Sequence, residues 1–243
     1  MNCLLLQVDM VGLLIQFAWV FILAAYIMLV VLFATRKTFE WMTKHRVRKK
    51  DAIYYNRKLV HIFAGGVVVL LVPVVFKYPL FPLFCGLALA AFTYFFHKRK
   101  TMLYWFQTEE NYNDVTFCIM WGLSIFVLWT LLNMQGVENA AWIAIIPSTF
   151  MALGDGITGI VRNVAFRERT KHPIGNVYMA FLCIPFGYYL GLLGGGQQMA
   201  IVGIVAALIA SIVERYEIGP IDDNVLITLC SSVVLFVGGI FIF

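Results

Sequence analysis

Long apolar runs separated by short polar segments dominate this chain of 243 residues. Apolar and polar positions do not alternate within the runs, which favours helices over the strands of a β-barrel. A helix needs about 20 apolar residues to cross a hydrocarbon core that is roughly 30 Å thick. We therefore expect an all-α integral membrane protein with about eight transmembrane helices, at residues 11–35, 59–76, 79–96, 115–133, 141–161, 176–193, 199–213 and 225–243.

Lysine and arginine residues are confined almost entirely to alternate gaps between these runs. Seventeen of the 18 fall in four such gaps: nine in 36–58, three in 98–100, four in 162–171, and Arg215. Lys77 is the exception. Because short loops rich in Lys and Arg stay on the cytoplasmic side of a membrane, the pattern predicts an N-terminus outside and these four gaps inside.

The composition agrees with a membrane location and excludes a soluble enzyme. Hydrophobic residues make up 62% of the chain and charged residues 13%, against about 25% charged in soluble domains. The longest gap, 36–58, is too short for a separate soluble domain, so we expect one polytopic membrane domain over 1–243. The net charge of +5 favours anionic lipid headgroups or a phosphorylated substrate as partners, and not nucleic acid.

The first polar group opens the second apolar run. On a helix, Arg57 and His61 are i,i+4 neighbours and Lys58 and His61 are i,i+3 neighbours, so three donors converge near one face. A basic flank that extends toward the headgroups is the plain alternative for Arg57 and Lys58. It explains His61 less well, because this residue lies inside the apolar run, and we interpret the group as functional.

A carboxylate lies inside the fifth run, in Gly154-Asp155-Gly156-Ile157-Thr158-Gly159. Placing a charge there costs at least ~2.5 kcal/mol, so Asp155 requires a partner or an ion. The flanking glycines allow a close helix approach or a local break. The alternative is a purely structural ion pair between Asp155 and an arginine of a loop.

Two further groups occur where predicted helices begin on the same side. Lys171, followed by Gly175 and Asn176, combines a cation with a helix N-terminus, which suits a phosphate but is weak as an isolated motif. Asp222-Asp223-Asn224 offers hard oxygen ligands for Mg²⁺ and a possible proton acceptor. Helix capping by one of these residues is the alternative, although a cap needs only a single side chain.

Together these groups place cations and carboxylates at one membrane face beside apolar helices. Cations suit a polyphosphate, carboxylates suit its metal ion, and the apolar surroundings suit a lipid acceptor, which points to phosphoryl or nucleotidyl transfer to a lipid. The sequence contains neither a GxxxxGK[ST] loop nor the protein-kinase signature set, so a nucleotide site of either soluble type is excluded.

The ordered set of motifs resembles the polyprenol kinase family, which includes dolichol kinases, phytol kinases and CTP-dependent diacylglycerol kinases. The resemblance covers 56–243, the expected catalytic core, through four motifs: Arg57-Lys58-x-x-His61, Gly154-Asp155, Lys171-x-x-x-Gly175-Asn176, and Glu214 followed by Asp222-Asp223-Asn224. It implies an all-helical membrane enzyme that uses CTP and Mg²⁺, or another divalent cation, to phosphorylate a lipid alcohol at the cytoplasmic face.

The resemblance also implies roles for individual residues. Asp155, Asp222 and Asp223 would be the catalytic and metal-binding carboxylates, without a distinction between base and ligands. The nucleotide and its metal would be bound by Arg57, Lys58, His61, Lys171, Gly175, Asn176 and Asn224. The chain departs from the family pattern at His172-Pro173, at Arg162, where a second Gly is common, and at Asn176, where Ser or Thr is usual.

The leading hypothesis is therefore a CTP-dependent dolichol or polyprenol kinase in the cell membrane of a prokaryote or the endoplasmic reticulum membrane of a eukaryote. A cytidylyltransferase that makes a CDP-lipid is the second hypothesis, although the Lys-Asp…His-Gly-Gly…Asp-Arg pattern of phosphatidate cytidylyltransferases is not found. A lipid or ion transporter with Asp155 as coupling site is the third. The sequence shows no convincing inverted repeat, and its polar groups gather at one face, both of which disfavour transport.

Overall fold

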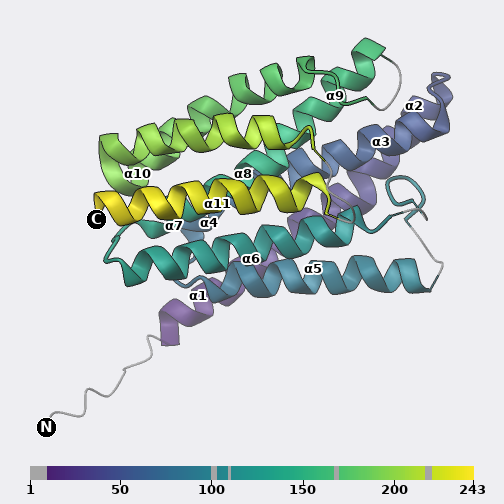
Figure 1. The fold of residues 1–243 in the computed structure, drawn as a ribbon. Helices are drawn as coiled ribbons and strands as arrows, with labels where there is room; N and C mark the ends of the chain where they lie inside the picture. The colour runs from purple at the N-terminus through teal and green to yellow at the C-terminus, as the bar shows by residue number, and fades with distance from the viewer. Residues whose placement is uncertain (1–9, 100–102, 109–110, 167–169, 217–220) are drawn as a thin grey trace, which may run out of the picture.

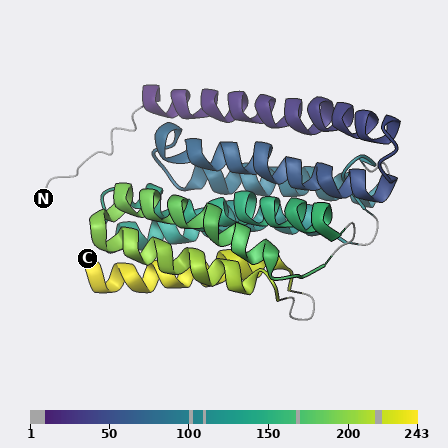
Figure 2. The same cartoon turned by 90° about the horizontal axis from the view of Figure 1, so that it is seen from above.

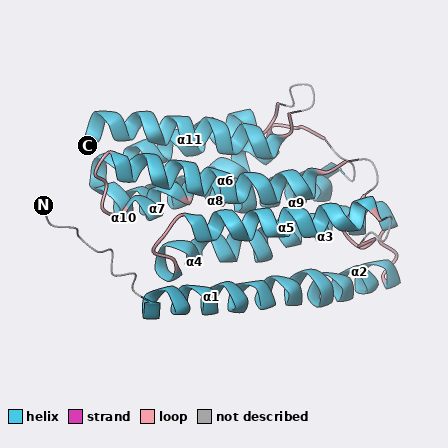
Figure 3. Cartoon of the chain, turned by 90° about the horizontal axis from the view of Figure 1, so that it is seen from below, coloured by secondary structure: helices cyan, strands magenta, loops and turns pink. Residues whose placement is uncertain are grey.

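The structure is a computed structural model that describes residues 10–99, 103–108, 111–166, 170–216 and 221–243. Helices are the regular elements of this part of the chain (Figure 3). In chain order they are α1 (Met10–Met28), η1 (Leu29–Ala34), α2 (Thr35–Lys44), α3 (Lys49–Leu59), η2 (Val60–Gly66), α4 (Val67–Val75), α5 (Leu80–Lys98), α6 (Asn113–Met134), α7 (Ala140–Ala144), α8 (Ile146–Thr149), η3 (Phe150–Gly154), α9 (Asp155–Phe166), α10 (Ile174–Val213) and α11 (Asp223–Ile242), where η marks a π-helical turn.

Seven helices in the described residues are long and apolar enough to cross a membrane, consistent with the predicted integral membrane protein. Three of them are composite, because a π-helical segment joins their parts without ending the helix. These composite helices run over Met10–Lys44, Lys49–Val75 and Ala140–Phe166. The last is the central one, since 83% of its most apolar window is buried inside the protein. It therefore packs against protein on nearly every side, whereas the others also face outward.

The basic segment 36–58 is helical over most of its length, which corrects the expectation of a loop. It contains no Gly or Pro, so nothing in it interrupts the helices that enter it from either side. Thr35–Lys44 and Lys49–Leu59 are joined by a turn in which Arg46 has a positive φ of 63°. The apolar positions Phe39 and Met42 are buried, so α2 packs against the protein through one face.

Helix α10 consists of two arms that pack side by side. The bend lies at Gly195 and Gly196, and the φ of 73° at Gly196 is a conformation that glycine adopts without strain. The two arms approach closely, because a Cβ on Gly187 would lie 2.3 Å from the carbonyl oxygen of Gly203. The separately predicted spans 176–193 and 199–213 correspond to these arms.

The helices lie roughly parallel in one bundle, with the described basic connections at one end (Figures 1 and 2). At this end α2, α5, α9 and the second arm of α10 finish, and α3, α6, α10 and α11 begin (Figure 1). We call it the basic end. Lys77, between α4 and α5, lies at the opposite end. The alternation of basic gaps thus becomes a spatial separation, while the assignment of the basic end to the cytoplasm stays a prediction.

Candidate functional site

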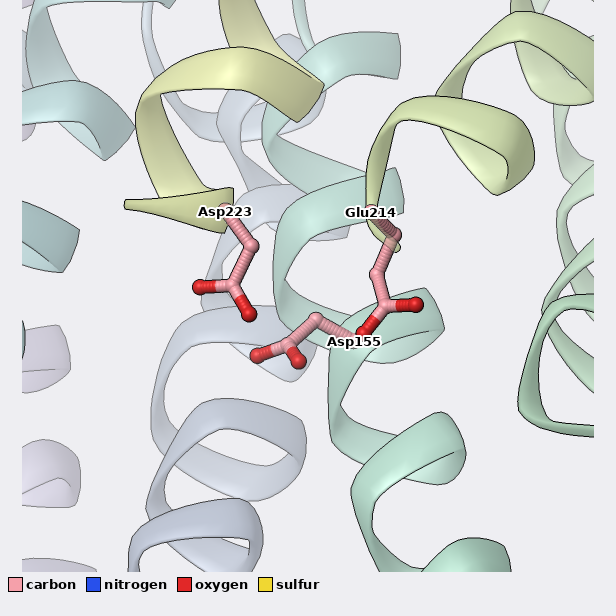
Figure 4. Close-up of side chains that lie close together, drawn as sticks. All are labelled: Asp155, Glu214 and Asp223. Atoms are coloured by element: carbon pink, nitrogen blue, oxygen red, sulfur yellow. The ribbon is translucent and has the colours of Figure 1, made fainter. Parts of the chain in front are cut away.

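Three carboxylates from distant parts of the sequence meet at the basic end. Asp155 begins α9, Glu214 follows α10, and Asp223 begins α11. One carboxylate oxygen from each lies within 4.8 Å of the others, and the three side chains point toward a common centre (Figure 4). Asp155 and Glu214 are 2% and 1% exposed. Three acidic groups this close and this deeply buried require positive charge between or beside them.

Lys58 supplies part of that charge. Its Nζ lies 2.7 Å from both carboxylate oxygens of Asp155. The approach depends on Gly159 in α9, because a Cβ there would lie 2.4 Å from Cε of Lys58. The lysine lies near the end of α3, and Asp155 follows η3 directly, so π-helical turns flank the pair on both composite helices. Such turns are frequent at functional sites.

Lys171 joins the other two carboxylates. Its Nζ donates to Oδ2 of Asp223 at 3.1 Å and to the backbone carbonyl of Glu214 at 3.0 Å. It also lies 3.7 Å from Oε1 of Glu214. The side chain is 28% exposed, so it faces the opening of the site while Lys58 lies deeper. One cation is thus embedded in the protein and the other is accessible to an incoming anion.

Glu214 is held in place by its own set of donors. Arg162 Nη1 donates to Oε1 at 2.7 Å, and Asn176 Nδ2 donates to Oε2 at 3.2 Å. Arg162 also donates to the carbonyl of His172 at 2.9 Å and to Oδ1 of Asn176 at 3.0 Å. Burial raises the pKa of the Glu214 carboxyl, and the hydrogen bond from Arg162 acts in the opposite direction.

Gly175 and Asn176 lie behind this arrangement. A Cβ on Gly175 would lie 2.4 Å from Nε of Arg162, so the glycine provides space for the guanidinium group. Asn176 also donates to the carbonyl of Ser211, which ties the start of α10 to its second arm. The His172 ring nitrogen Nδ1 accepts from the backbone N–H of Ile174 at 3.2 Å. Contacts within the protein thus engage this helix start, which the sequence offered as a phosphate site.

Asp222 and Asn224 flank Asp223 but differ from it in their contacts. Asp222 is the N-cap of α11, where its Oδ1 accepts from the N–H of Val225 at 3.2 Å and its Oδ2 accepts from Asn224 at 3.3 Å. Burial raises the pKa of the Asp222 carboxyl. Asn224 is 2% exposed, and its Oδ1 has no hydrogen-bond partner among the described residues. Asp222 therefore follows the capping alternative, and Asn224 retains an unused acceptor.

His61 lies on the other side of Asp155. Its Nδ1 is 3.2 Å from Oδ2 of Asp155, but the geometry is not that of a hydrogen bond. The ring stacks on Phe117, with centroids 4.0 Å apart and planes at 20°. The imidazole is 6% exposed and is positioned mainly by this stacking. One of its nitrogens is thus buried without a hydrogen bond beside a carboxylate.

These groups surround a polar cavity of about 310 Å³ at the basic end. It is lined by seven of the residues that the sequence predicted for the site: Arg57, Lys58, His61, Asp155, Lys171, Asp223 and Asn224. Asp222, Gly175 and Asn176 do not line it. The nucleotide-binding and catalytic roles assigned to all ten residues stay predictions.

The residues present fit a divalent cation. Carboxylate and amide oxygens are the ligands that Mg²⁺ prefers, and Asp155, Glu214 and Asp223 bring three carboxylates within reach of one ion. The carboxylate set differs from the predicted one, in which Asp222 stood in the place of Glu214. Asn224 lines the same cavity and has an unpartnered oxygen, so it extends the hard-ligand character of the site.

Sequence reasoning did not assign a role to Glu214 or Arg162, although both line the cavity. Arg162 was read as part of a basic loop and as a departure from a motif. Its buried ion pair with Glu214 joins residues 52 positions apart, which no local spacing reveals. The available signal was Glu214 itself, an isolated acidic residue at the end of an apolar run.

Comparisons of the chain with protein-family models, with curated proteins and with solved structures find no match. The likeness to polyprenol kinases therefore rests on the order of the motifs in the sequence. The geometry of the site has to be interpreted by its own chemistry.

Proposed function

We propose that the protein is a CTP-dependent kinase that phosphorylates a long-chain isoprenoid alcohol, of the dolichol or polyprenol type, at the cytoplasmic membrane face. The observation that carries the proposal is the meeting of Asp155, Glu214 and Asp223 with Lys58 and Lys171 in one cavity at the end of an apolar bundle. The choice of CTP and of an isoprenoid acceptor follows the motif resemblance.

Asp155, Glu214 and Asp223 would hold Mg²⁺ or another divalent cation. When bound, such an ion neutralises charge on the phosphates and on the group that is transferred. Because catalysis of phosphoryl transfer consists mainly of positioning and charge stabilisation, the rigid mounting of Glu214 by Arg162 and Asn176 suits this chemistry.

The basic side chains of the cavity would bind the nucleotide. Lys171 is partly exposed and Arg57 lines the same space, so both can meet a triphosphate that enters from the basic end. Lys58 is engaged by Asp155 on both oxygens and acts first on that carboxylate. Asn224 would contribute its unpartnered oxygen to the metal or to a donor group of the nucleotide.

The reaction transfers the γ-phosphoryl group to the alcohol oxygen and leaves CDP, while the hydroxyl proton passes to a base. Asp223 is the most accessible of the three clustered carboxylates, with 13% of its side chain exposed, against 3% for Asp155 and 2% for Glu214. It is therefore placed best among them to meet an acceptor and take this proton.

The position of the cluster also supports an enzyme over a transporter. Asp223 begins α11 and Glu214 follows α10, so the carboxylates gather where helices end. Coupling sites of secondary transporters lie near the bilayer midplane, at the interface of repeats.

The decisive experiment uses purified protein with Mg²⁺, a panel of isoprenoid alcohols, and CTP labelled at either the α- or the γ-phosphate. We expect the γ label to appear in a lipid monophosphate. Transfer of the α label with release of pyrophosphate would identify a cytidylyltransferase instead. Failure to label any lipid, together with CTP-independent flux in proteoliposomes, would support the transport hypothesis and reject the kinase.

A further inference from the structure

A second cavity, of about 300 Å³, lies inside the bundle between α1, the composite helix Lys49–Val75, α5 and α6. Its walls are almost entirely aliphatic and aromatic side chains, such as Leu23, Ile27 and Val68. Phe76, which also lines it, follows His61 by 15 residues, or roughly 20 Å of helix. The cavity is thus long enough to follow a hydrocarbon chain well into the bilayer.

The apolar cavity and the polar cavity share two residues, Arg57 and His61. His61 stacks on Phe117, which lines only the apolar cavity, while its Nδ1 is 3.2 Å from the carboxylate of Asp155 in the polar one. Nδ1 is buried and makes no hydrogen bond with the described residues. A polar atom left unpartnered at this junction suits a ligand group that has a polar head.

The described segment 103–108 separates the apolar cavity from the basic end. Leu103, Trp105 and Phe106 are buried, and Phe106 lines the cavity. Trp105 Nε1 donates to the carbonyl of Val31 at 3.0 Å, and Asn56 donates to the carbonyl of Trp105 at 2.9 Å. With this segment fastened on both sides, the shared residues Arg57 and His61 form the polar boundary of the cavity.

The opposite condition holds along the side of the bundle. Ala24 of α1 and Ala88 of α5 line the cavity and are themselves exposed. α1 buries only three of its residues, Gly12, Gln16 and Leu23, so it covers the cavity loosely. Both alanines lie within predicted membrane spans. A lipid chain can therefore reach the cavity from the bilayer without crossing water.

We propose that this cavity binds the hydrocarbon chain of a single-chain lipid alcohol and places its hydroxyl group at His61 and Arg57, beside the carboxylates. The assignment of the occupant as the acceptor rests on the proposed function, whereas binding itself requires no nucleotide. One continuous chamber with one polar junction fits one chain, and a two-chain glycerolipid would leave its second chain outside. The unpartnered Nδ1 of His61 and the Arg57 guanidinium supply the partners that a buried hydroxyl needs.

Photoaffinity labelling without CTP tests the binding step. The probe is a single-chain isoprenoid alcohol with a diazirine in its chain, used with the full-length protein in nanodiscs. The labelled peptides are mapped by mass spectrometry, and we expect them to come from α1, α5 and α6 around the cavity. An excess of the unlabelled alcohol should compete, while an equal excess of diacylglycerol or phosphatidylcholine should not.

Two double variants provide a matched pair. Ala24→Phe/Ala88→Phe places bulk in the cavity, and Ala25→Phe/Ala91→Phe places the same bulk at exposed positions on the same helices that do not line it. We expect labelling to fall at least tenfold in the first variant and to stay within twofold in the second. The KM for the alcohol should rise similarly in the first variant only, with the KM for CTP unchanged.

The outcomes separate the two proposals. Selective labelling without transfer of the γ label would reject the kinase and leave the lipid site in place. Transfer of the γ label with the same alcohol KM in both double variants would keep the kinase and overturn the cavity assignment. Equal labelling of the two variants, or equal competition by phosphatidylcholine, would reduce the cavity to ordinary bilayer contact, and competition by diacylglycerol would overturn the single-chain occupant.

Discussion

Two buried histidine–aspartate pairs lie in this bundle, and their surroundings differ. His97 Nε2 lies 3.0 and 3.2 Å from the two oxygens of Asp114, and Gln107 donates to the same carboxylate at 2.7 Å. Gln107 in turn accepts from the N–H of Leu103 at 2.9 Å, so this pair fastens segment 103–108. Each group has a specific partner.

The pair of His61 and Asp155 is arranged in another way. Asp155 binds Lys58 and lies beside two more carboxylates, while Nδ1 of His61 has no hydrogen bond among the described residues. A carboxylate satisfied by neutral donors stabilises a fold. Crowded carboxylates with an unused donor or acceptor nearby are typical of a site that expects a ligand. Residue types alone do not distinguish these cases, whereas their neighbours do.

The largest expected effect comes from Asp223→Asn. The substitution preserves shape but removes one charge of the proposed metal site, and Lys171 keeps its bond to the Glu214 carbonyl. We expect turnover to fall by roughly a thousandfold or more, equivalent to about 4 kcal/mol, measured by γ-label transfer at saturating CTP. The unfolding temperature should barely change. Full activity would remove Asp223 from the reaction.

Asp155→Asn tests the buried ion pair. It leaves Lys58 charged and without its carboxylate at a side chain that is only 11% exposed, which should cost about 3–5 kcal/mol of stability. The double variant Asp155→Asn/Lys58→Met should recover most of that stability but none of the activity, as seen by thermal unfolding in detergent and by the kinase assay. Asp114→Asn should cost less, because no lysine pairs with that carboxylate in the described structure.

The two histidines provide a direct contrast. His61→Ala should lower turnover by about a hundredfold, because it removes a group at the junction of polar site and lipid cavity. His97→Ala should leave turnover within about threefold and instead lower stability by about 1–3 kcal/mol, through loss of a buried hydrogen bond. Equal losses of turnover in both variants would contradict the distinction.

The smallest effect concerns pH and Asp222. Its folded-state pKa is raised above the ordinary value of 3.8 by burial, so the protonated form is favoured by folding. The stability contributed by this group is present below pH 3.8 and is lost as the pH rises through the raised pKa. Asp222→Asn retains a capping side chain but does not titrate. The unfolding temperature of the wild type relative to this variant should therefore decline with rising pH across that window. A constant difference would argue against the shift.

The apolar pattern was sufficient to predict most of the fold, because each crossing requires a long apolar run. It was insufficient where helices continue beyond the apolar runs. α2 and α3 are polar on one face and packed on the other, and Phe39 and Met42 are too few to stand out among nine cations. The burial of Trp105 was similarly hidden, since it depends on contacts with Val31 and Asn56.

Within the site, chemistry that is costly in a membrane was visible from the sequence, whereas partnership was not. Asp155 and Asp223 were identified because carboxylates at span ends require a reason. Glu214 received no separate role, since its importance depends on Arg162 and Asn176, which approach it from other helices. Asp222 and Asp223 could not be distinguished by sequence, because only the direction of the helix start decides which of them caps α11.

The π-helical turn Phe150–Gly154 has a consequence for how the chain tolerates change. Each residue of an α-helix turns the chain by about 100°, so removal of one residue from this wide turn would allow regular winding and rotate everything after it by that angle. Thr149 and Asp155 would still belong to one unbroken helix of nearly the same length. Yet the carboxylate would face away from Lys58. A deletion that spectroscopy of helix content would scarcely register could thus silence the protein completely.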